Sequence, residues 1–236
     1  MTVVSTVRQE ISEAARVLSG LGLVTAYGHI SVRTGAVMLI TPAADLSTVT
    51  DAGIVEIGLD AELLPAGAPA ESWAHLALYR ARPDVESIAR AQPSSAFAVS
   101  ALTRSMPPLH GQAAWLGESV PVHDSARLLR SPDLAAAAAA ELPVGEALLL
   151  RGNGALTLGA TAGVTVARMW LLSLACDVWL AAVTAAATTP AGEVQPLTAA
   201  EIAAWRAVRD ELLPRLWLSL QRRVPSSATA ALTAGR

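Results

Sequence analysis

The sequence contains no lysine, and all 17 of its basic residues are arginines. Schiff-base catalysis and pyridoxal-phosphate catalysis both require a lysine amine, so this chain can carry out neither. Charge of either sign is scarce, since 16% of residues are charged and the formal net charge is −3. A chain without a broad basic surface is poorly suited to nucleic acid, and we expect no such partner.

The sequence also has a single cysteine, Cys176, which cannot form an internal disulfide. This fits a reducing compartment. Cys176 follows an apolar run and has no base nearby in the sequence, so we expect a small buried side chain. The first residues include Arg8, Glu10 and Glu13, unlike a secretory signal peptide. We therefore expect a cytoplasmic protein.

Long hydrophobic runs are rare for a chain that is 53% apolar. Charged residues interrupt the longest ones, at Glu141, Arg168 and Asp177. We expect no run to reach the ~20 residues that span a bilayer, and hence no membrane partner. With 236 residues, the apolar content is instead sufficient for a substantial core.

Helical and strand-like segments alternate along the chain, which predicts one α/β domain over residues 1–223. A capping-box pattern places the start of the first helix at Thr6, and a second one starts a late helix at Thr198. Further helices are expected over 71–81, 93–102, 131–141 and 162–186, and strands over 30–33, 37–40, 54–59, 85–92 and 147–150. Residues 224–236 are rich in Ser, Thr and Ala, which predicts a flexible tail.

Six short segments together resemble the class II aldolase/adducin family, which includes fuculose-phosphate aldolase, ribulose-phosphate epimerase and some aromatic-acid decarboxylases. They are Gly-His-Ile-Ser-Val-Arg at 28–33, Leu-Ile-Thr-Pro at 39–42, Pro-Ala-Glu-Ser at 69–72, Arg-Pro-Asp-Val at 82–85, Met-Pro-Pro-Leu-His at 106–110 and Gly-Asn-Gly at 152–154. No single segment is specific, but their order and spacing are. The resemblance implies a three-layer αβα sandwich with a mixed, mainly antiparallel sheet, and a homo-oligomer, commonly a ring-shaped tetramer.

The family's metal-binding histidines are replaced in this sequence by Arg90, Gln92 and Asn153. In the family, a zinc held by imidazoles polarises the substrate while a carboxylate moves the proton. Arginine is a permanent cation that removes a ligand and repels the ion. We therefore expect no metal and no other cofactor. Two hydroxyls and a glycine of the phosphate-binding turns are also replaced, which argues against a sugar phosphate as substrate.

Three residues are the candidates for catalysis in this altered pocket: Glu71, Arg90 and His110. The resemblance places Glu71 at the proton-transfer carboxylate, although a first-turn glutamate is also favoured by the helix dipole. Arg90 can bind a substrate carboxylate or an enolate oxygen, or it can pair with Glu71 and plug the cavity. His110 can act as an acid or base, or be a buried structural histidine.

Five more residues are candidates for substrate binding: His29, Ser31, Gln92, Trp115 and Asn153. Gln92 and Asn153 can bond a polar ligand or each other. Trp115 follows His110 and is a candidate pocket wall. We expect His75 to pack or cap within its helix, and His123 to lie at the surface or at a helix start.

Three hypotheses for function follow. The first is a metal-independent, lyase-like enzyme for a small carboxylated or enolisable molecule, aromatic ones included, that couples proton transfer to C–C cleavage, decarboxylation or cyclisation in bacterial specialised metabolism. The second is a non-catalytic, adducin-like binding or assembly module. The third, a metal held by His29, His110 and Glu71, lacks any supporting spacing. An open cavity with convergent donors favours the first, and collapse of Arg90 onto Glu71 favours the second.

Overall fold

Eight strands form the central sheet of the computed structural model, which describes residues 3–189 and 192–224. They are β1 (His29–Thr34), β2 (Val37–Ile40), β3 (Val55–Gly58), β4 (Ser87–Ala91), β5 (Ser105–Met106), β6 (Val120–His123), β7 (Ala147–Leu150) and β8 (Gly154–Gly159). Their order is β3-β2-β1-β4-β8-β7-β6-β5. All neighbours pair antiparallel except β6 and β7. This confirms the predicted mixed, mainly antiparallel sheet.

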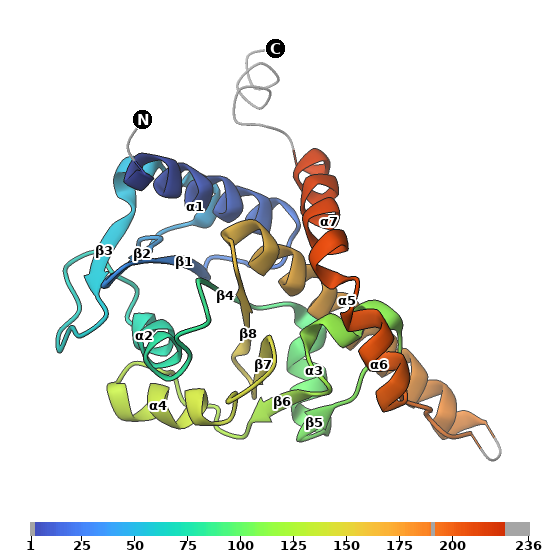
Figure 1. The fold of residues 1–236 in the computed structure, drawn as a ribbon. Helices are drawn as coiled ribbons and strands as arrows, with labels where there is room; N and C mark the ends of the chain where they lie inside the picture. Colours follow the sequence, from blue (N-terminus) through green and yellow to red (C-terminus); the bar gives the residue numbers. More distant parts are fainter. Residues whose placement is uncertain (1–2, 190–191, 225–236) are drawn as a thin grey trace, which may run out of the picture.

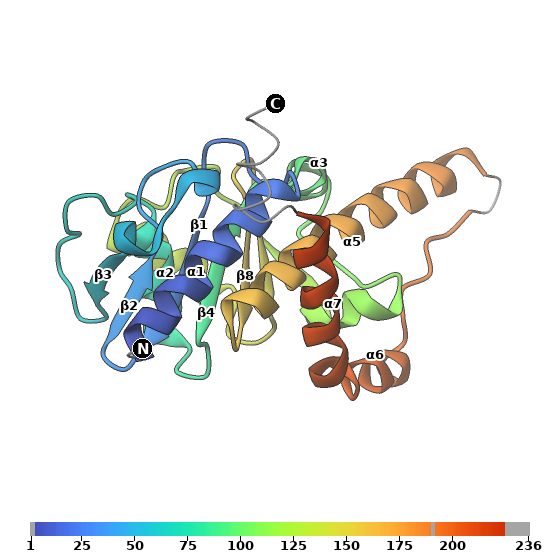
Figure 2. The same cartoon turned by 90° about the horizontal axis from the view of Figure 1, so that it is seen from above.

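The helices cover both faces of this sheet (Figures 1 and 2). They are α1 (Val3–Gly20), α2 (Ser72–Ala81), α3 (Ser94–Leu102), α4 (Pro132–Ala140), α5 (Ala162–Thr188), α6 (Ala199–Arg206) and α7 (Arg209–Arg223). Helices α2 and α4 pack together on one face, while α1 and the first half of α5 lie on the other (Figure 1). The expected three-layer αβα sandwich is confirmed.

Alternation along the strands divides the apolar side chains between two cores. Ile30 on β1 and Ala89 on β4 belong to the core under α1 and α5. Ile88 on β4 belongs to the core under α2 and α4. His29 and Ser31 alternate with Ile30, so their side chains point to the α2 face. The sequence pattern of β1 thus directs two polar side chains toward α2.

Two helix boundaries differ from the prediction. Helix α1 begins at Val3, so Thr6 lies inside the helix rather than at its start. The capping box at Thr198 is present, with Glu201 bonded to it reciprocally. The helix that it starts ends at Arg206, however, and α7 follows as a separate helix.

Helix α5 corrects the expectation about hydrophobic runs. Its 27 residues are long and apolar enough, by length and composition, to cross a membrane, with a hydropathy of 1.7. Arg168 does not interrupt the helix, because it is buried and pairs with Glu146 at 3.1 Å. Val166 and Leu172, in the first half, are fully buried in the core. The first half of α5 therefore packs in the core, although only 22% of its most apolar 18-residue window is buried.

The end of the described chain packs against its beginning. Val224 is buried, and its side chain lies where a Cβ on Gly20 would be placed. The expected tail therefore does not start at residue 224. Its remaining part, 225–236, lies outside the described residues.

Candidate active site at the ends of β1 and β4

The site is built where β1 and β4 lie side by side. Their register places His29 opposite Arg90. Both side chains point to the α2 face of the sheet, and both are buried. Glu71 immediately precedes α2 and brings a carboxylate to the same place. Three chemically different groups from separate segments thus meet at one edge of the fold.

The two oxygens of the Glu71 carboxylate are held differently. Oε1 accepts from the Asn153 amide at 2.9 Å and from the Leu129 backbone N–H at 3.2 Å. Oε2 has an ion pair with Arg90 Nη2 at 3.4 Å. No bond from the Glu71 side chain caps α2. Helix capping therefore does not explain this glutamate, and Oε2 is the oxygen with fewer close donors.

The Arg90 guanidinium is tied mainly to protein acceptors. Nη2 donates to both the backbone oxygen, at 3.0 Å, and the side-chain oxygen of Asn153. Nη1 donates to Tyr27 O at 3.3 Å. The Gln92 amide, oriented to satisfy both of its groups, accepts from Nη2 at 3.2 Å and donates to Tyr27 O. Nε is buried and has no partner among the described groups. Burial lowers the pKa of Arg90, while Glu71 opposes this shift.

The position of Asn153 depends on a tight turn between β7 and β8. Gly154 has φ +84°, and a Cβ placed on it would lie 2.2 Å from the Ala91 carbonyl oxygen. Only glycine permits this close approach. The turn therefore places Asn153 directly beside the end of β4.

A cavity of about 290 Å³ opens at this cluster. Its wall carries His29, Glu71 and Arg90, and its remaining lining is Ala26, Tyr27, Gly28, Ala43, Ala44, Asp45, Pro69, Ala70 and Arg130. The Arg90–Glu71 pair is formed, as a plugged pocket would require, but it does not fill the cavity. The structure thus has both the open cavity expected of an enzyme and the Arg90–Glu71 pair expected of a binding module.

Behind the cavity wall, four side chains form a continuous buried chain of hydrogen bonds. His29 Nδ1 lies 2.7 Å from His75 Nε2, and His75 Nδ1 lies 2.7 Å from Ser31 Oγ. Ser31 Oγ is 2.8 Å from the Tyr79 hydroxyl, which is 3.5 Å from Glu86 O. Ser31 therefore lies behind the wall rather than in the cavity. His75 packs within the fold as expected, and it also makes this specific contact.

The two histidines in this chain of hydrogen bonds, His29 and His75, are held neutral. Burial lowers the pKa of His29 well below its ordinary value, and His75 and Arg90 lower it further. Burial, followed by the charge of Arg90, lowers the pKa of His75 to about 3. Burial raises the pKa of Tyr79, so its hydroxyl keeps its proton.

Neither His110 nor Trp115 is among the residues that line this cavity. His110 precedes a 3-10 helix over Gly111–Leu116 that packs against α6. Trp115 is buried there, and its Nε1 donates to Trp205 O at 2.8 Å. The expectation that both residues join Glu71 is not met within one chain, because this segment turns toward α6.

His123 is a further correction to the expected surface positions. It ends β6, is 6% exposed, and its Nδ1 lies 2.9 Å from a Glu141 oxygen.

The residues that the resemblance places at the family's metal position do not fit a zinc ion. The Arg90 guanidinium occupies the space beside Asn153 and supplies only donors. Among the described residues, no group of three or more His, Cys, Asp or Glu side chains could hold a metal. The alternative set of His29, His110 and Glu71 is not brought together either, since His110 does not line the cavity.

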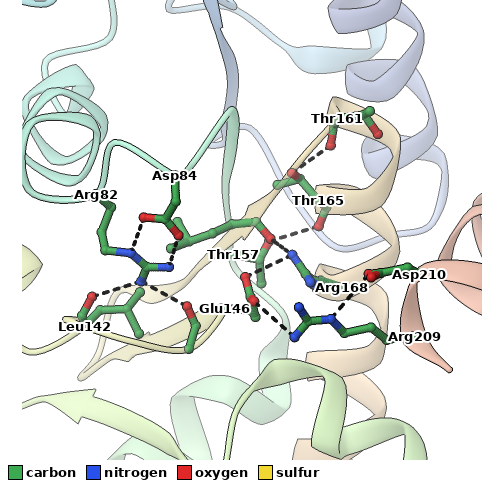
Figure 3. Close-up of polar contacts among 12 residues, drawn as sticks. Arg82, Asp84, Leu142, Glu146, Thr157, Thr161, Thr165, Arg168, Arg209 and Asp210 are labelled. Carbon is green, nitrogen blue, oxygen red and sulfur yellow. Dashed lines mark hydrogen bonds and ion pairs between the residues drawn. The ribbon is translucent and has the colours of Figure 1, made fainter. Parts of the chain in front are cut away.

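A second cavity, of about 440 Å³, lies at the opposite part of the sheet near α7. Figure 3 shows that its charged residues bond mainly to one another. Glu146 pairs with Arg168 at 3.1 Å and with Arg209 at 3.8 Å, and Arg209 in turn contacts Asp210. Arg168 also donates to Leu158 O. This network connects α5 and α7 to the sheet, so we assign it a structural role.

Sequence reasoning missed several residues of the site. Tyr27, Asp45 and Arg130 line the cavity but carry no motif of their own. A signal for the buried chain does exist, since His75 and Tyr79 follow Glu71 at intervals of four on one helix face. Arg130 could not be found in this way, because its proximity depends on tertiary structure alone.

Solved structures with this architecture include L-fuculose-1-phosphate aldolases. An L-fuculose-1-phosphate aldolase from Thermus thermophilus superposes with a TM-score of 0.72 at 25% identity, covering 80% of this chain and all of that one. Residues 9–180 match the family model for the class II aldolase and adducin N-terminal domain. The protein therefore belongs to the class II aldolase/adducin family, whose aldolases are lyases.

Two curated relatives add detail. One, from Streptomyces roseochromogenus subsp. oscitans, is a 4-hydroxy-3-prenylphenylpyruvate oxygenase/4-hydroxy-3-prenylbenzoate synthase, 30% identical over 68% of this chain. The other is L-fuculose phosphate aldolase of Escherichia coli (strain K12), 35% identical over 40% of this chain. The alignments span 60% and 45% of these two relatives.

Proposed function

We propose that the protein is a metal-independent, lyase-like enzyme that acts on a small carboxylated or enolisable molecule. It couples proton transfer to C–C cleavage, decarboxylation or cyclisation. The observation that carries the proposal is the meeting of Glu71 and Arg90 on the wall of an open cavity. A carboxylate beside a fixed cation can remove a proton from carbon while the cation stabilises the developing negative charge.

In this scheme Glu71 Oε2 accepts the proton. Oε1 already accepts two hydrogen bonds, whereas Oε2 has the longer contact with Arg90. Arg90 supplies the positive charge that attracts a substrate carboxylate or enolate oxygen. Gln92 and Asn153 orient the guanidinium rather than contact the substrate directly.

An aromatic α-keto acid is the substrate class that we favour. The Streptomyces relative is named for a prenylated phenylpyruvate and a prenylated benzoate, both of which are aromatic carboxylates. A carbon next to a carbonyl is acidic enough for a positioned carboxylate to deprotonate. We further propose that the protein works in the cytoplasm, in bacterial specialised metabolism, as a homo-oligomer, with a tetramer expected from the family.

Deuterium exchange tests this proposal without knowledge of the complete reaction. The protein is incubated with 4-hydroxyphenylpyruvate in D₂O, and loss of the proton next to the carbonyl is followed by NMR above the buffer rate. Glu71→Gln is expected to lower the catalysed rate by about 10²-fold or more. Arg90→Met is expected to weaken binding, because the fixed cation is lost.

Two exposed positions supply matched controls, Glu62→Gln and Arg215→Met, since neither residue lines the cavity. Both are expected to behave as wild type. Elemental analysis and dialysis against a chelator accompany the assay, and activity is expected to survive the chelator. Exchange that depends on neither Glu71 nor Arg90, or that stops on chelation, would refute the assignment.

A non-catalytic binding module is the second candidate, and one observation favours it. Arg90 already bonds Asn153, Tyr27 and Glu71, so much of its donor capacity is used by the protein. For such a module, no exchange is expected above the buffer rate. The Glu71→Gln variant would then bind small carboxylates as wild type does.

A further inference from the structure

A buried chain of hydrogen bonds leads from the core to the cavity through His29. It consists of Tyr79, Ser31, His75 and His29, joined by contacts of 2.8, 2.7 and 2.7 Å. Each of these contacts contains one proton, and the hydroxyl of Ser31 has only one to give. Among the described residues its hydroxyl contacts only Tyr79 and His75, so it donates to one of them and accepts from the other. The four groups therefore donate in one common direction, either toward the cavity or away from it.

The contacts at Tyr79 decide this direction. Its proton can go to Ser31 Oγ at 2.8 Å or to Glu86 O at 3.5 Å. The first distance is that of a good O–H···O hydrogen bond, and the second is not. Glu86 O also already accepts from the Arg33 backbone N–H at 2.8 Å. Tyr79 therefore donates to Ser31.

The remaining protons follow from that choice. Ser31 then donates to His75 Nδ1, because among the described residues this ring nitrogen is the only other partner of its hydroxyl and the only acceptor for its proton. His75 is neutral, so its proton lies on Nε2 and is donated to His29 Nδ1. His29 is neutral too, and its own proton then lies on Nε2. The reverse direction would leave Tyr79 with the poor contact.

His29 Nε2 is the end of the hydrogen-bond chain that lies at the cavity. The residue lines the cavity and is 4% exposed. Among the described residues, no group forms a hydrogen bond with Nε2. Nε2 is also not one of the completely buried atoms that lack a partner, so it keeps some access to solvent. A nearly buried N–H donor that lacks a protein acceptor is stabilised when a ligand oxygen accepts from it.

We propose that His29 is a fixed, neutral N–H donor that bonds a carbonyl or anionic oxygen of the substrate, with His75 and Ser31 as positioning residues that set its tautomer. The assignment rests on the proposed function and deepens it. When Glu71 Oε2 takes a proton from carbon, the C–H electron pair moves toward the carbonyl oxygen. That oxygen becomes an enolate and accepts from His29 Nε2–H, with Arg90 in the same wall adding positive charge.

The alternative role for His29 is that of a base, and the surroundings oppose it. Burial lowers the pKa of His29, and His75 on α2 and Arg90 on β4 lower it further. Glu71, the anion on the same cavity wall, pairs with Arg90 instead. A neutral donor polarises an oxygen without becoming charged, so no buried imidazolium has to form.

Nitrogen-15 NMR of histidine-labelled full-length protein tests the tautomers directly, because protonated and unprotonated ring nitrogens resonate far apart. The chain has only four histidines, so His29→Gln and His75→Gln identify the two signals, with His110 and His123 as internal references. At pH 7 we expect both His29 and His75 to carry their proton on Nε2. A proton on Nδ1 of His29, or a charged ring, would overturn the inference.

Two hydroxyl variants test the positioning role. Ser31→Ala removes the donor to His75 Nδ1, so we expect both histidines to lose their single tautomer. Tyr79→Phe is the matched variant, because Ser31 then has only His75 to donate to, and we expect the tautomers to stay. Unchanged spectra in Ser31→Ala would eliminate Ser31 as a positioning residue.

A ligand titration separates this inference from the proposed function. Saturation with 4-hydroxyphenylpyruvate is expected to move the His29 Nε2–H resonances. His29→Leu is expected to weaken binding about tenfold, as for one lost hydrogen bond to a charged group, and His29→Gln to restore part of it. If the affinity falls when Arg90 is replaced but not when His29 is replaced, His29 is not the donor, whereas the proposed function remains supported. Absence of binding to wild type with both rings protonated on Nε2 would refute the substrate class alone.

Discussion

At the scale of single residues, the Arg90–Glu71 pair combines the proposed catalytic role with a structural one. The two side chains are 3% and 13% exposed, so both charges are largely withdrawn from water. Breaking such a pair leaves one buried charge without its partner. Arg90→Met is therefore expected to lower the free energy of unfolding by about 3 kcal/mol, measured by urea denaturation at fixed protein concentration.

The double variant Arg90→Met/Glu71→Gln checks the cause of that loss. With both charges removed, the combined loss is expected to be smaller than the sum of the two single losses by about 1 kcal/mol or more. Simple additivity would mean that the two side chains do not interact energetically. The ion pair at 3.4 Å would then contribute little to the free energy of unfolding.

The buried histidines make stability depend on pH. Folding lowers the pKa of His75 to about 3 and that of His29 well below its ordinary value, so the unfolded chain binds more protons below its pKa of about 6.5. The stabilisation that comes from keeping these histidines neutral is therefore fully present above pH 6.5. It is lost progressively as the pH falls toward the folded-state pKa. The expected slope is about 1.4 kcal/mol per pH unit for each histidine. His75→Gln should give a shallower fall between pH 6.5 and 5 in the same urea experiment, and an equal fall would contradict this account.

At the scale of secondary structure, amphipathic helices and buried strands were largely predictable because their periodicity is local. The sequence did not reveal β5, β6 or β8. The residues of β8 follow a glycine turn and are buried on both faces without alternation. The sequence also did not predict the division into α6 and α7, where no glycine or proline separates the two helices. Both features depend on packing against distant segments rather than on local propensity.

The site divides in the same way. Glu71, Arg90, Gln92 and Asn153 were predicted as a group from motif positions, and they do lie together. The contact of His75 with His29 was not predicted, because it depends on α2 lying under β1. His110 was expected near Glu71 from its motif alone, but the segment that follows it turns to pack against α6.

The β7–β8 turn offers a prediction at this scale. Gly154→Ala would place a Cβ 2.2 Å from Ala91 O at a φ of +84°, so the turn must shift. We expect a loss of unfolding free energy of about 3 kcal/mol, together with impaired ligand binding as Asn153 moves. Gly35→Ala is the matched control, because its φ is +62° but nothing lies within 4 Å of the new Cβ. It is expected to lose about 1 kcal/mol, and equal effects of the two variants would show that the close approach is unimportant.

At the scale of the whole molecule, α5 is a long helix that a single chain buries only in part. Its first half is buried in the core, whereas no residue of this helix after Trp179 is buried within one chain. Figure 2 shows this second half extending away from the sheet. Its exposed side is made largely of alanines, including Ala181 and Ala185. A long apolar helix that protrudes from a weakly charged molecule is the surface on which we expect subunits to associate.

Sedimentation equilibrium tests that expectation. Wild type is expected to have a mass well above the 24.3 kDa of one chain, with four times this value for a tetramer. Ala181→Arg and Ala185→Arg would place charge on the protruding part of α5 and are expected to shift the protein toward the monomer, because a buried unpaired charge opposes association. Ala200→Arg, at an exposed position of α6, is the control and should leave the mass unchanged. If the α5 variants keep the wild-type mass, subunits must associate through another surface, and the apolar composition of α5 would then need a different explanation.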